Sequence, residues 1–277
     1  MATIIQSIAI HPENYRFLQE SVYSEVGIVL EDNKQYLLEG RLQPIATRLG
    51  LASVNELCRT MRHSGNPEMT RMIAEAMTTN ETYFFREPQH YEAIKTLLLP
   101  RLKAEVGQAR KLRFWSAAAS TGQEAYSLAM MMLEQGMESS NIQILGTDFS
   151  SKVVERARSG LYHQIEANRG LPASLLVKYF HRVGTNWQLS ANVTRMASFE
   201  TFDLRRSMRT MGPFDLVFCR NVMIYFDNET KRKMIKEIHS TLFRGGWLLI
   251  GGAETPSGLN EYFQEQRIGS TAIYIAR

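Results

Sequence analysis

Small residues and an acid follow two neighbouring apolar stretches of the chain. The segment Ser116–Gly122, with the sequence Ser-Ala-Ala-Ala-Ser-Thr-Gly, comes directly after the first stretch. Small residues allow a backbone to pass close to a ligand. Asp148 ends the second stretch, 26 residues after Gly122, where a carboxylate can accept hydrogen bonds from both hydroxyls of a ribose. The pattern therefore favours a site for a nucleoside cofactor.

The same turn contains a single glycine. A dinucleotide site usually carries Gly-x-Gly-x-x-Gly, whose backbone approaches a pyrophosphate, and here only Gly122 is present. The turn is therefore poorly suited to bind a pyrophosphate, whereas it can still bind an adenosine without phosphates. A structural turn followed by a helix-capping Asp148 explains the same residues, and this pattern alone leaves both interpretations open.

Strands and helices alternate around these residues. We expect strands over Leu112–Ser116, Ile142–Thr147, Phe214–Cys219 and Gly246–Gly251. We expect helices over Gln123–Leu133 and Thr230–Leu242, and a further helix that begins at Ser150 or Ser151. Such alternation is typical of the α/β class with a doubly wound parallel sheet, in which ligands bind at the carboxyl ends of strands. Ile273–Ala276 closes the chain and predicts a final hairpin.

The spacing of apolar residues also predicts the domain organisation. We expect a helical domain over residues 1–85, followed by a linker with a connecting helix over residues 86–110. A sheet domain follows over residues 111–277, with an insertion at about 160–200. The insertion combines a helix at Ala173–Phe180 with a hairpin turn near Gly184–Leu189. No strand is expected before residue 110, and Pro44 should kink its helix or lie near a helix start.

The composition is that of a globular protein with a sizeable core. The 277 residues are 44% hydrophobic and 22% charged. No apolar run approaches the roughly 20 residues needed to cross a bilayer, and Met1–Ile5 shows no basic segment followed by an apolar block, so we expect no secretory signal. Cys58 and Cys219 give neither a disulfide framework nor metal-ligand spacing. We therefore expect a protein of the reducing cytoplasm without a metal.

Basic residues gather in the N-terminal part of the chain. Five arginines and only two acids lie between residues 41 and 71, namely Arg41, Arg48, Arg59, Arg62, Arg71, Glu56 and Glu68. The net charge of +4 is mild and does not demand a nucleic-acid partner. A patch for an anionic partner is one interpretation and a solvated helix face is the other, and charge alone does not decide between them.

Several longer motifs stand in a fixed order along the chain. They are Thr78–Glu87, Trp115–Glu124, Gly146–Ser150, Phe218–Phe226 and Gly245–Glu254. With them the chain closely resembles the CheR family of chemoreceptor glutamate O-methyltransferases, over about residues 15–270. The resemblance implies a Rossmann-like domain that uses S-adenosylmethionine, a small N-terminal all-α domain and an inserted antiparallel β-subdomain.

The resemblance also implies roles for residues at matching positions. Asn80, Thr82 and Arg86 resemble residues that reach the methionine end of the cofactor. Glu124 resembles the acid that takes the amino group of the cofactor. Asp148 matches the acid that binds its ribose, in agreement with the pattern described above.

Further residues complete the implied site. The other cofactor-binding positions are Ala118, Asp203, Leu204, Arg220 and Asn221. Of these, Asp203 and Leu204 stand where the family contacts adenine, and family members often carry Asn at the Asp203 position. Tyr225 resembles an active-site tyrosine near the transferring methyl, so Arg86 and Tyr225 are the catalytic candidates.

The implied substrate is a glutamate on the acidic helical bundle of a chemoreceptor cytoplasmic domain. The implied recognition residues are Arg41, Arg48, Arg59 and Arg62, although the family often shows several arginines where Pro44 and Thr47 stand here. In the family the inserted hairpin can dock a receptor C-terminal peptide, but the short turn at Gly184–Asn186 favours a member that does not need this tether. We expect a cytoplasmic monomer associated with receptor arrays at the inner membrane, with S-adenosylhomocysteine as product and no nucleic-acid partner.

Each assignment has a simpler alternative. Tyr225 could be a core aromatic residue, Arg86 could pair with Glu87 or Glu81 on the surface, and Cys219 fits a buried small hydrophobe. The competing functions are a methyltransferase that acts on nucleic acid or a small molecule, and a non-catalytic module that binds the cofactor. The chain lacks the Asn/Asp-Pro-Pro-aromatic motif common in DNA amine methyltransferases.

Overall fold

A computed structural model describes residues 9–106 and 109–277 of the chain. Its compact units are a helical unit, Met1–Thr79 with Tyr225–Asp227, and a sheet unit, Asn80–Ile224 with Asn228–Arg277. The division falls after Thr79, whereas the apolar spacing predicts a helical domain that continues to residue 85. The expectation for the Met1–Ile5 segment lies outside the described residues.

The helical unit is built from four helices. They are α1 (Pro12–Val26), α2 (Gln35–Arg48), α3 (Val54–Ser64) and α4 (Pro67–Met77). Ser53 caps α3 by accepting a hydrogen bond from the Glu56 amide, and Gly27 and Gly65 end α1 and α3 in the left-handed conformation that glycine adopts without strain. Among the described residues no strand precedes residue 110, as expected. Pro44 lies inside α2, which excludes the second of the two predicted possibilities, a position near a helix start.

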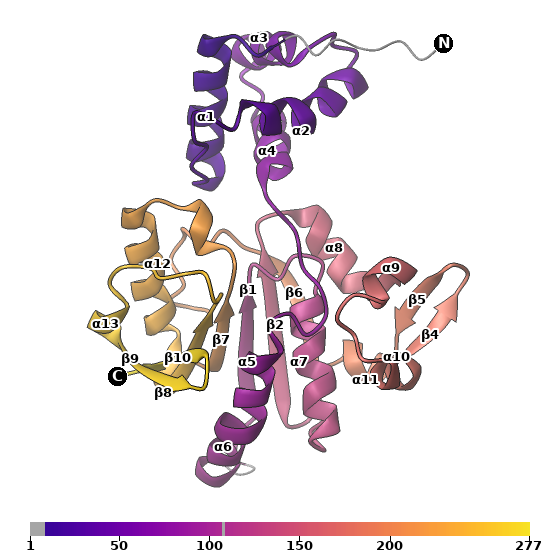
Figure 1. Cartoon of the computed structure of the whole chain (residues 1–277), viewed down its shortest axis with the longest axis vertical. Coiled ribbons are helices and arrows are strands. Elements are labelled where there is room, and N and C mark those ends of the chain that lie inside the picture. The colour runs from indigo at the N-terminus through magenta and orange to yellow at the C-terminus, as the bar shows by residue number, and fades with distance from the viewer. Residues whose placement is uncertain (1–8, 107–108) are drawn as a thin grey trace. The chain divides into compact units, whose positions relative to one another are not determined.

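The sheet unit contains a seven-stranded sheet (Figure 1). Its strands, in the order in which they lie side by side, are β6 (Ala197–Thr201), β2 (Ile142–Asp148), β1 (Leu112–Ala117), β7 (Phe214–Cys219), β8 (Leu242–Ile250), β10 (Thr271–Ala276) and β9 (Phe263–Ile268). The first five run parallel, and β10 is antiparallel to both of its neighbours. The expected parallel sheet and final hairpin are therefore confirmed.

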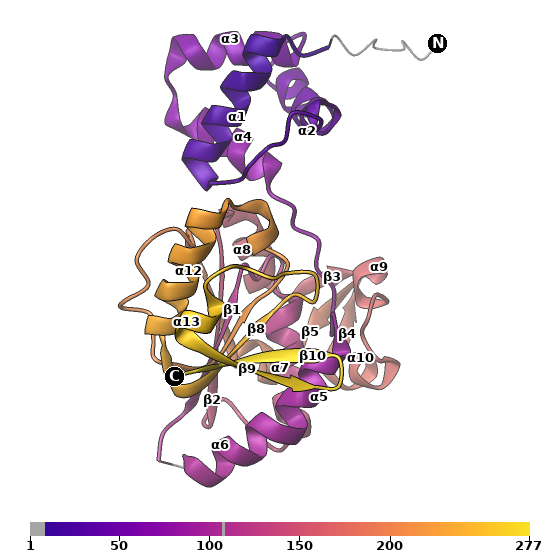
Figure 2. The same cartoon turned by 60° about the vertical axis from the view of Figure 1, so that its left-hand side comes forward.

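Helices cover both faces of this sheet (Figure 2). They are α5 (Pro88–Ala93), a π-helical turn (Ile94–Leu98), α6 (Leu99–Glu105), α7 (Gln123–Glu134), α8 (Ser151–Ser159), α12 (Asn228–Ser240) and α13 (Leu259–Tyr262). A 3-10 turn (Met223–Tyr225) follows β7. Helix α7 packs against β1, β2 and β6, and α5 packs against β10. Gly146 is required on β2, because a Cβ there would lie 2.4 Å from the ring of Phe199 on β6.

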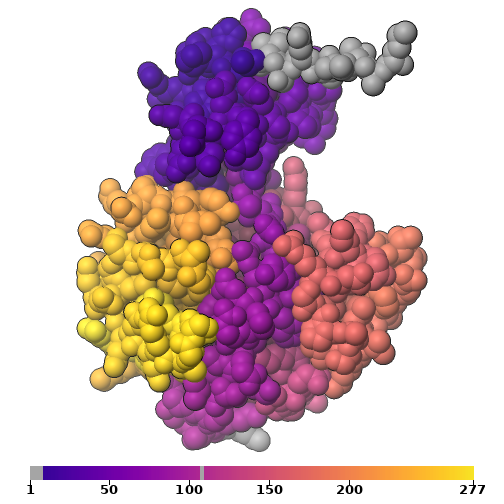
Figure 3. All heavy atoms as spheres, viewed as in Figure 1, coloured from indigo at the N-terminus to yellow at the C-terminus, as the bar shows by residue number. Residues whose placement is uncertain are grey.

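The insertion forms a second, three-stranded antiparallel sheet, as the resemblance implies. Its elements are β3 (Leu161–His163), β4 (Phe180–Val183), β5 (Asn186–Leu189), α9 (Gln164–Ala167), α10 (Ala173–Tyr179) and α11 (Ala191–Thr194). Figure 3 shows the segment of α5 and α6 (purple) between the insertion (coral) and the C-terminal hairpin (yellow). A Cβ on Gly170 would lie 2.1 Å from the carbonyl oxygen of Phe84, so the insertion packs directly against the backbone that leads into α5.

Two kinds of feature are absent from the described residues. Within residues 9–106 and 109–277, no helix has the length and apolar character that a membrane crossing requires. The same residues contain no group of three or more His, Cys, Asp or Glu side chains placed to hold a metal ion.

Candidate functional site at the carboxyl edge of the parallel strands

The predicted cofactor turn, Ser116–Gly122, is held to the end of the neighbouring strand by Asp148. One carboxylate oxygen of Asp148 accepts a hydrogen bond from the Ser120 amide at 2.9 Å, and the other accepts from the Ser150 amide at 3.0 Å. Ala118 and Ser120 both have positive φ angles, 61° and 51°. Non-glycine residues in this region cost about 1–3 kcal/mol each, and such strain is typical of functional sites. The acid and the small residues that the sequence singled out therefore do lie together.

Gly122 is needed at the end of this turn for two reasons. Its φ of 90° is in the left-handed region, and a Cβ would lie 3.0 Å from the side chain of Ala157 and 3.1 Å from the Phe199 ring. Helix α7 begins at the next residue. The glycine thus allows the turn to pass close beneath α8 and β6, which brings Glu124 to the edge of the sheet.

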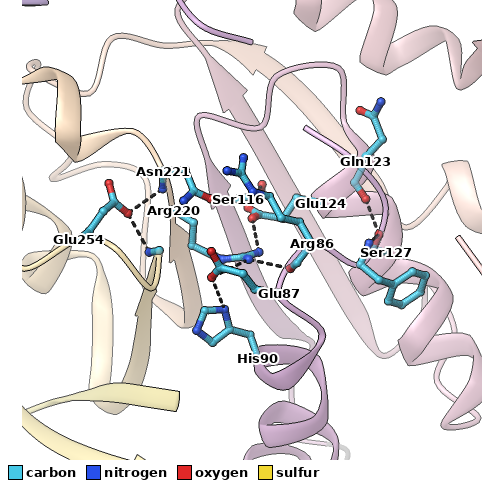
Figure 4. A network of polar contacts seen from close by, with 12 residues as sticks. Arg86, Glu87, His90, Ser116, Gln123, Glu124, Ser127, Arg220, Asn221 and Glu254 are labelled. Atoms are coloured by element: carbon cyan, nitrogen blue, oxygen red, sulfur yellow. Dashed lines mark hydrogen bonds and ion pairs between the residues drawn. The ribbon is translucent and has the colours of Figure 1, made fainter. Parts of the chain in front are cut away.

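Glu124, in the first turn of α7, forms a buried ion pair with Arg220 at the end of β7 (Figure 4). Arg220 Nη1 lies 2.8 Å from one carboxylate oxygen, and the Ser116 hydroxyl donates to the other at 2.7 Å. The Arg220 side chain is 1% exposed and that of Glu124 is 13% exposed. Burial raises the pKa of the Glu124 carboxyl, and the positive charges of Arg220 and Arg86 partly oppose this.

Arg220 also binds the segment that enters α5. Its Nη2 donates to the carbonyl oxygen of Arg86 at 2.7 Å and lies 3.1 Å from a carboxylate oxygen of Glu87. Glu87 has a φ of 56°, and Phe85 has a φ of 52°. One buried guanidinium therefore joins α7, β7 and a strained stretch of the linker. Sequence reasoning named Arg220 and Glu124 but considered Glu87 only as a possible surface partner of Arg86.

His90 extends this network and was also missed by the sequence reasoning. Its Nδ1 lies 3.2 Å from the same carboxylate of Glu87, and the residue is buried. Burial, reinforced by the charge of Arg220, lowers the pKa of His90 to about 4, against the opposing effect of Glu87. The imidazole is therefore neutral near pH 7. No periodic signal in the sequence distinguishes His90, because its role depends on a contact between side chains.

The linker residues predicted to reach the cofactor lie along this edge. The Ser120 hydroxyl donates to the carbonyl oxygen of Asn80 at 2.8 Å, and Thr82 is half-buried. Arg86 donates to the carbonyl oxygen of Glu81 at 3.0 Å. The carboxylate of Glu81 pairs instead with Arg169. Among the described residues, Arg86 therefore forms no ion pair with the carboxylate of Glu81 or Glu87, and its contact with Glu81 is to the main chain.

The adenine positions, Asp203 and Leu204, follow β6. Leu204 is buried, and the Asp203 carboxylate accepts hydrogen bonds from the guanidinium of Arg205 at 2.7 Å and 3.0 Å. An aspartate oxygen can accept but not donate a hydrogen bond, unlike the Asn common in the family. Because β6, β2, β1 and β7 are neighbours, the predicted residues after these four strands share one edge of the sheet.

The loop after β7 carries Asn221, and it is held by an acid that sequence reasoning left without a role. Asn221 has a φ of 57°. The carboxylate of Glu254 accepts hydrogen bonds from four backbone amides of this loop and of the loop after β8. Cys219, directly before Arg220, is buried, and burial raises the pKa of its thiol well above the usual range, in agreement with a packing role.

The remaining predicted residues belong to the helical unit. The Val29 amide donates to the carbonyl oxygen of Tyr225 at 2.9 Å, and Tyr225 is half-buried. Arg41 donates to the carbonyl oxygens of Met77 at 2.8 Å and Thr78 at 2.9 Å, at the end of α4. The guanidinium of Arg62 donates to Asn14 at 2.7 Å and lies over an aromatic ring of α1.

The predicted basic patch therefore divides into two kinds of residue. Arg41 and Arg62 donate hydrogen bonds that join elements of the helical unit, although Arg62 is itself exposed, as are Arg48 and Arg59. Neither Arg48 nor Arg59 forms an ion pair with another described residue. The guanidinium groups of Arg48 and Arg59 are therefore less engaged within the helical unit than those of Arg41 and Arg62.

Comparison with known proteins accounts for both units. A family described as the CheR methyltransferase SAM binding domain matches residues 80–271, and one described as the CheR methyltransferase all-alpha domain matches residues 13–78. The chain belongs to the CheR methyltransferase family. The CheR domains meet next to the division between the compact units, and the cofactor class that the sequence pattern favours agrees with the SAM binding domain.

CheR relatives match over nearly the whole length of the chain. A chemotaxis protein methyltransferase from Vibrio parahaemolyticus is 37% identical over 97% of this chain and 98% of the relative. Chemotaxis protein methyltransferase 1 from Pseudomonas aeruginosa is 38% identical over 91% and 93%. Among solved structures, a magnesium protoporphyrin IX methyltransferase from Synechocystis, with SAM bound, covers 79% of this chain and 94% of its own at 17% identity, but its TM-score of 0.38 is too low to carry an argument.

Proposed function

We propose that this chain transfers the methyl group of S-adenosylmethionine to glutamate carboxylates on the cytoplasmic helices of chemoreceptors. The relatives named chemotaxis protein methyltransferase support the receptor substrate. The observation that supports the site best is the buried ion pair between Glu124 and Arg220, at the edge where Asp148 holds the cofactor turn. A nucleic-acid or small-molecule substrate has no comparable support.

The chemistry of the site residues fits S-adenosylmethionine. The methionine end of this cofactor carries an ammonium and a carboxylate, and Glu124 and Arg86 supply the opposite charges. Arg86 is near enough for its charge to act on the pKa of Glu124, against the larger effect of burial. Asp148, at the end of β2, is the proposed acceptor of hydrogen bonds from the ribose. The cofactor-binding residues proposed in full are Asn80, Thr82, Arg86, Ala118, Glu124, Asp148, Asp203, Leu204, Arg220 and Asn221.

The proposed reaction places few demands on acid–base chemistry. A glutamate carboxyl has a reference pKa of about 4.3, so it is already an anionic nucleophile at neutral pH and needs no general base. The bound cofactor supplies a methyl group on a positively charged sulfur. The negative charge of the carboxylate and the positive charge of the sulfur are cancelled as the methyl group is transferred. The residues of the site therefore act by excluding water and by aligning the carboxylate oxygen with the methyl carbon.

Arg86 and Tyr225 are the proposed residues that aim the substrate carboxylate. A strong pair between a guanidinium and the attacking oxygen would weaken the nucleophile, because the same lone pairs serve both interactions. We therefore assign Arg86 to the non-attacking oxygen or to the carboxylate of the cofactor. Tyr225 supplies a hydroxyl on the segment that continues from the Arg220–Asn221 loop.

The receptor surface is proposed to be acidic and helical. Exposed Arg48 and Arg59 are suited to steer such a partner, more so than Arg41 and Arg62, whose guanidinium groups bind within the helical unit. The turn between β4 and β5 is short, with Gly184 at a φ of 60°. We accordingly propose a monomer that works at receptor arrays without a tethering peptide. Tight capture of the chain by receptor C-terminal peptides would contradict this last point.

The experiment that tests the function is transfer of a labelled methyl group from S-adenosylmethionine to receptor-containing membranes. We expect label on the receptor that is released as methanol by mild base, as a carboxyl methyl ester requires. A receptor with glutamine in place of the methyl-accepting glutamates is the control and should remain unlabelled. Base-stable label, label on nucleic acid, or no label would overturn the proposal.

A further inference from the structure

Glu254 lies after β8 and gathers the backbone of two loops around one carboxylate (Figure 4). One oxygen accepts from the amides of Asn221 at 2.6 Å and Gly251 at 2.7 Å. The other accepts from the amides of Val222 at 3.0 Å and Ile224 at 3.3 Å. Three of these four amides belong to the loop that follows Arg220.

The number of these bonds decides what Glu254 can do. A carboxylate offers about four lone-pair sites, and four amides occupy them here. Glu254 is buried, and no Lys, Arg or His of the described residues forms an ion pair with it. Its charge is therefore balanced by amide dipoles, and no acceptor site is left for a ligand. This acid can position a ligand-binding loop, but it cannot serve as a ligand-binding group itself.

The loop that Glu254 holds has a strained backbone. Asn221 adopts a left-handed φ of 57°, which a non-glycine residue rarely takes without support. Gly251 adds to the constraint, since a Cβ there would lie 2.6 Å from Asn221 Nδ2 and 2.8 Å from Glu254 Oε2. The carboxylate and the glycine together leave one backbone path between Arg220 and Ile224.

We infer that Glu254 is a positioning residue for the cofactor, acting through the Arg220–Ile224 loop. Arg220 begins this loop, and its guanidinium holds Glu124 in place. Asn221 is the second residue of the Arg220–Ile224 loop and is one of the proposed cofactor-binding residues. The inference rests on the proposed function, because the contact between Asn221 and the cofactor is part of it. It assigns to Glu254 the task of fixing where Arg220 and Asn221 lie before the cofactor binds.

The test substitutes Glu254→Gln, which keeps the size of the side chain. The amide turns an NH2 group toward two backbone N–H donors and leaves them without an acceptor. In the protein without cofactor, we expect hydrogen exchange at the amides of Asn221, Val222, Ile224 and Gly251 to become at least about tenfold faster. We expect the affinity for S-adenosylhomocysteine, measured by calorimetry, to fall roughly tenfold or more.

Glu237→Gln is the matched control. Glu237 also accepts a backbone hydrogen bond, from the Met208 amide at 2.8 Å, but it lies on α12, and none of its described hydrogen bonds involves a proposed cofactor residue. Because Gln keeps one carbonyl oxygen for this single amide, this variant should retain most of the protection at Met208 and bind S-adenosylhomocysteine with unchanged affinity. Where Glu254→Gln does not fold, Glu254→Asp takes its place, since it keeps the charge and shortens the reach.

The possible results separate the inference from its premise. Faster exchange confined to the four amides, together with weaker binding, supports the positioning role. Unchanged binding in spite of faster exchange would reduce Glu254 to a structural residue, and so would an equal loss of binding in Glu237→Gln. Failure of the unmodified protein to bind S-adenosylhomocysteine would instead overturn the cofactor assignment on which the inference depends.

Discussion

Arg220 in the sheet unit and Arg48 in the helical unit carry the same charge in opposite surroundings. The Arg220 side chain is 1% exposed and lies between the carboxylates of Glu124 and Glu87. Arg48 is exposed, and the one side-chain contact described for it is with the sulfur of Met72. A buried cation between two acids cannot be removed without leaving charges uncompensated, whereas a surface cation is screened by water and salt.

On the proposed function, this difference separates residues that build the cofactor site from residues that steer the receptor toward it. Removal of Arg220 should affect stability, cofactor binding and catalysis together. Removal of Arg48 should change only the encounter with the receptor, and only at low salt. Arg86 and Arg41 lie between these extremes, because each donates to main-chain carbonyl groups from a half-buried position.

The largest effect is expected for Arg220→Met. The side chain keeps most of its length but leaves Glu124 and Glu87 without their cation, so we expect unfolding to become about 3 kcal/mol easier and S-adenosylhomocysteine binding to be lost. Urea denaturation and calorimetry measure the two quantities. The control is Arg267→Met, since Arg267 is 74% exposed and pairs with Glu265. Equal stability of the two variants would contradict the importance given to burial.

Arg86→Ala should separate catalysis from stability. The described contacts of Arg86 include a single main-chain hydrogen bond, so the variant should fold and melt nearly as the unmodified protein does. Methyl transfer to the receptor should nevertheless fall by a factor of about 100 or more, because the substrate and the cofactor lose a charged contact. Arg169→Ala, which changes another arginine beside the ring of Tyr83, is the control. Near-normal turnover in Arg86→Ala would remove Arg86 from the site.

The parts of this site that the sequence predicts are those that local patterns specify. The turn Ser116–Gly122 and the acid Asp148 each follow an apolar strand, and the parallel order of the sheet then brings them together. The pair of Glu124 and Arg220 spans 96 positions of the chain. The resemblance to a family supplied those two residues, since no periodicity in the sequence connects them.

The residues that were not predicted share a physical reason. Glu87, His90 and Glu254 act through contacts with backbone amides or with other side chains, and such contacts depend on the exact path of the loops. Charge counting also did not foresee the contacts that Arg41 makes within the helical unit. Its place on a basic stretch suggests a surface role, but the packing of α2 against α4 directs it to the carbonyl groups at a helix end.

His90 provides a comparison that depends on pH. Its pKa falls from 6.5 to about 4 through burial, so the unfolded chain binds a proton between these values and the folded protein does not. The contribution of His90 to stability is therefore present above pH 6.5 and is lost as the pH falls toward 4, by up to about 3 kcal/mol. His90→Gln should flatten this part of the stability profile, measured by urea denaturation, while His181→Gln at an exposed site should not. A profile unchanged by His90→Gln would contradict the assignment.

Arg41 and Arg48 offer a matched pair on one helix. Arg41→Met removes the hydrogen bonds to the end of α4, so we expect the helical unit to lose about 1–2 kcal/mol of stability. Arg48→Met should change stability by less than about 0.5 kcal/mol. Denaturant midpoints of the two variants decide between these outcomes. Equal midpoints would return Arg41 to the surface role that its sequence context suggests.

The smallest effect is expected for the paired substitution of Arg48 and Arg59 by alanine. Two exposed cations contribute a few tenths of a kcal/mol each to an encounter with an acidic bundle, so the KM for receptor should rise about threefold at low salt. The difference should shrink as salt screens the charges, and the affinity for S-adenosylhomocysteine should not change. Arg244→Ala, at an exposed position of the sheet unit, is the control. A KM that is unaffected at low salt would mean that the receptor is recognised elsewhere, and that these two arginines belong to a solvated helix face.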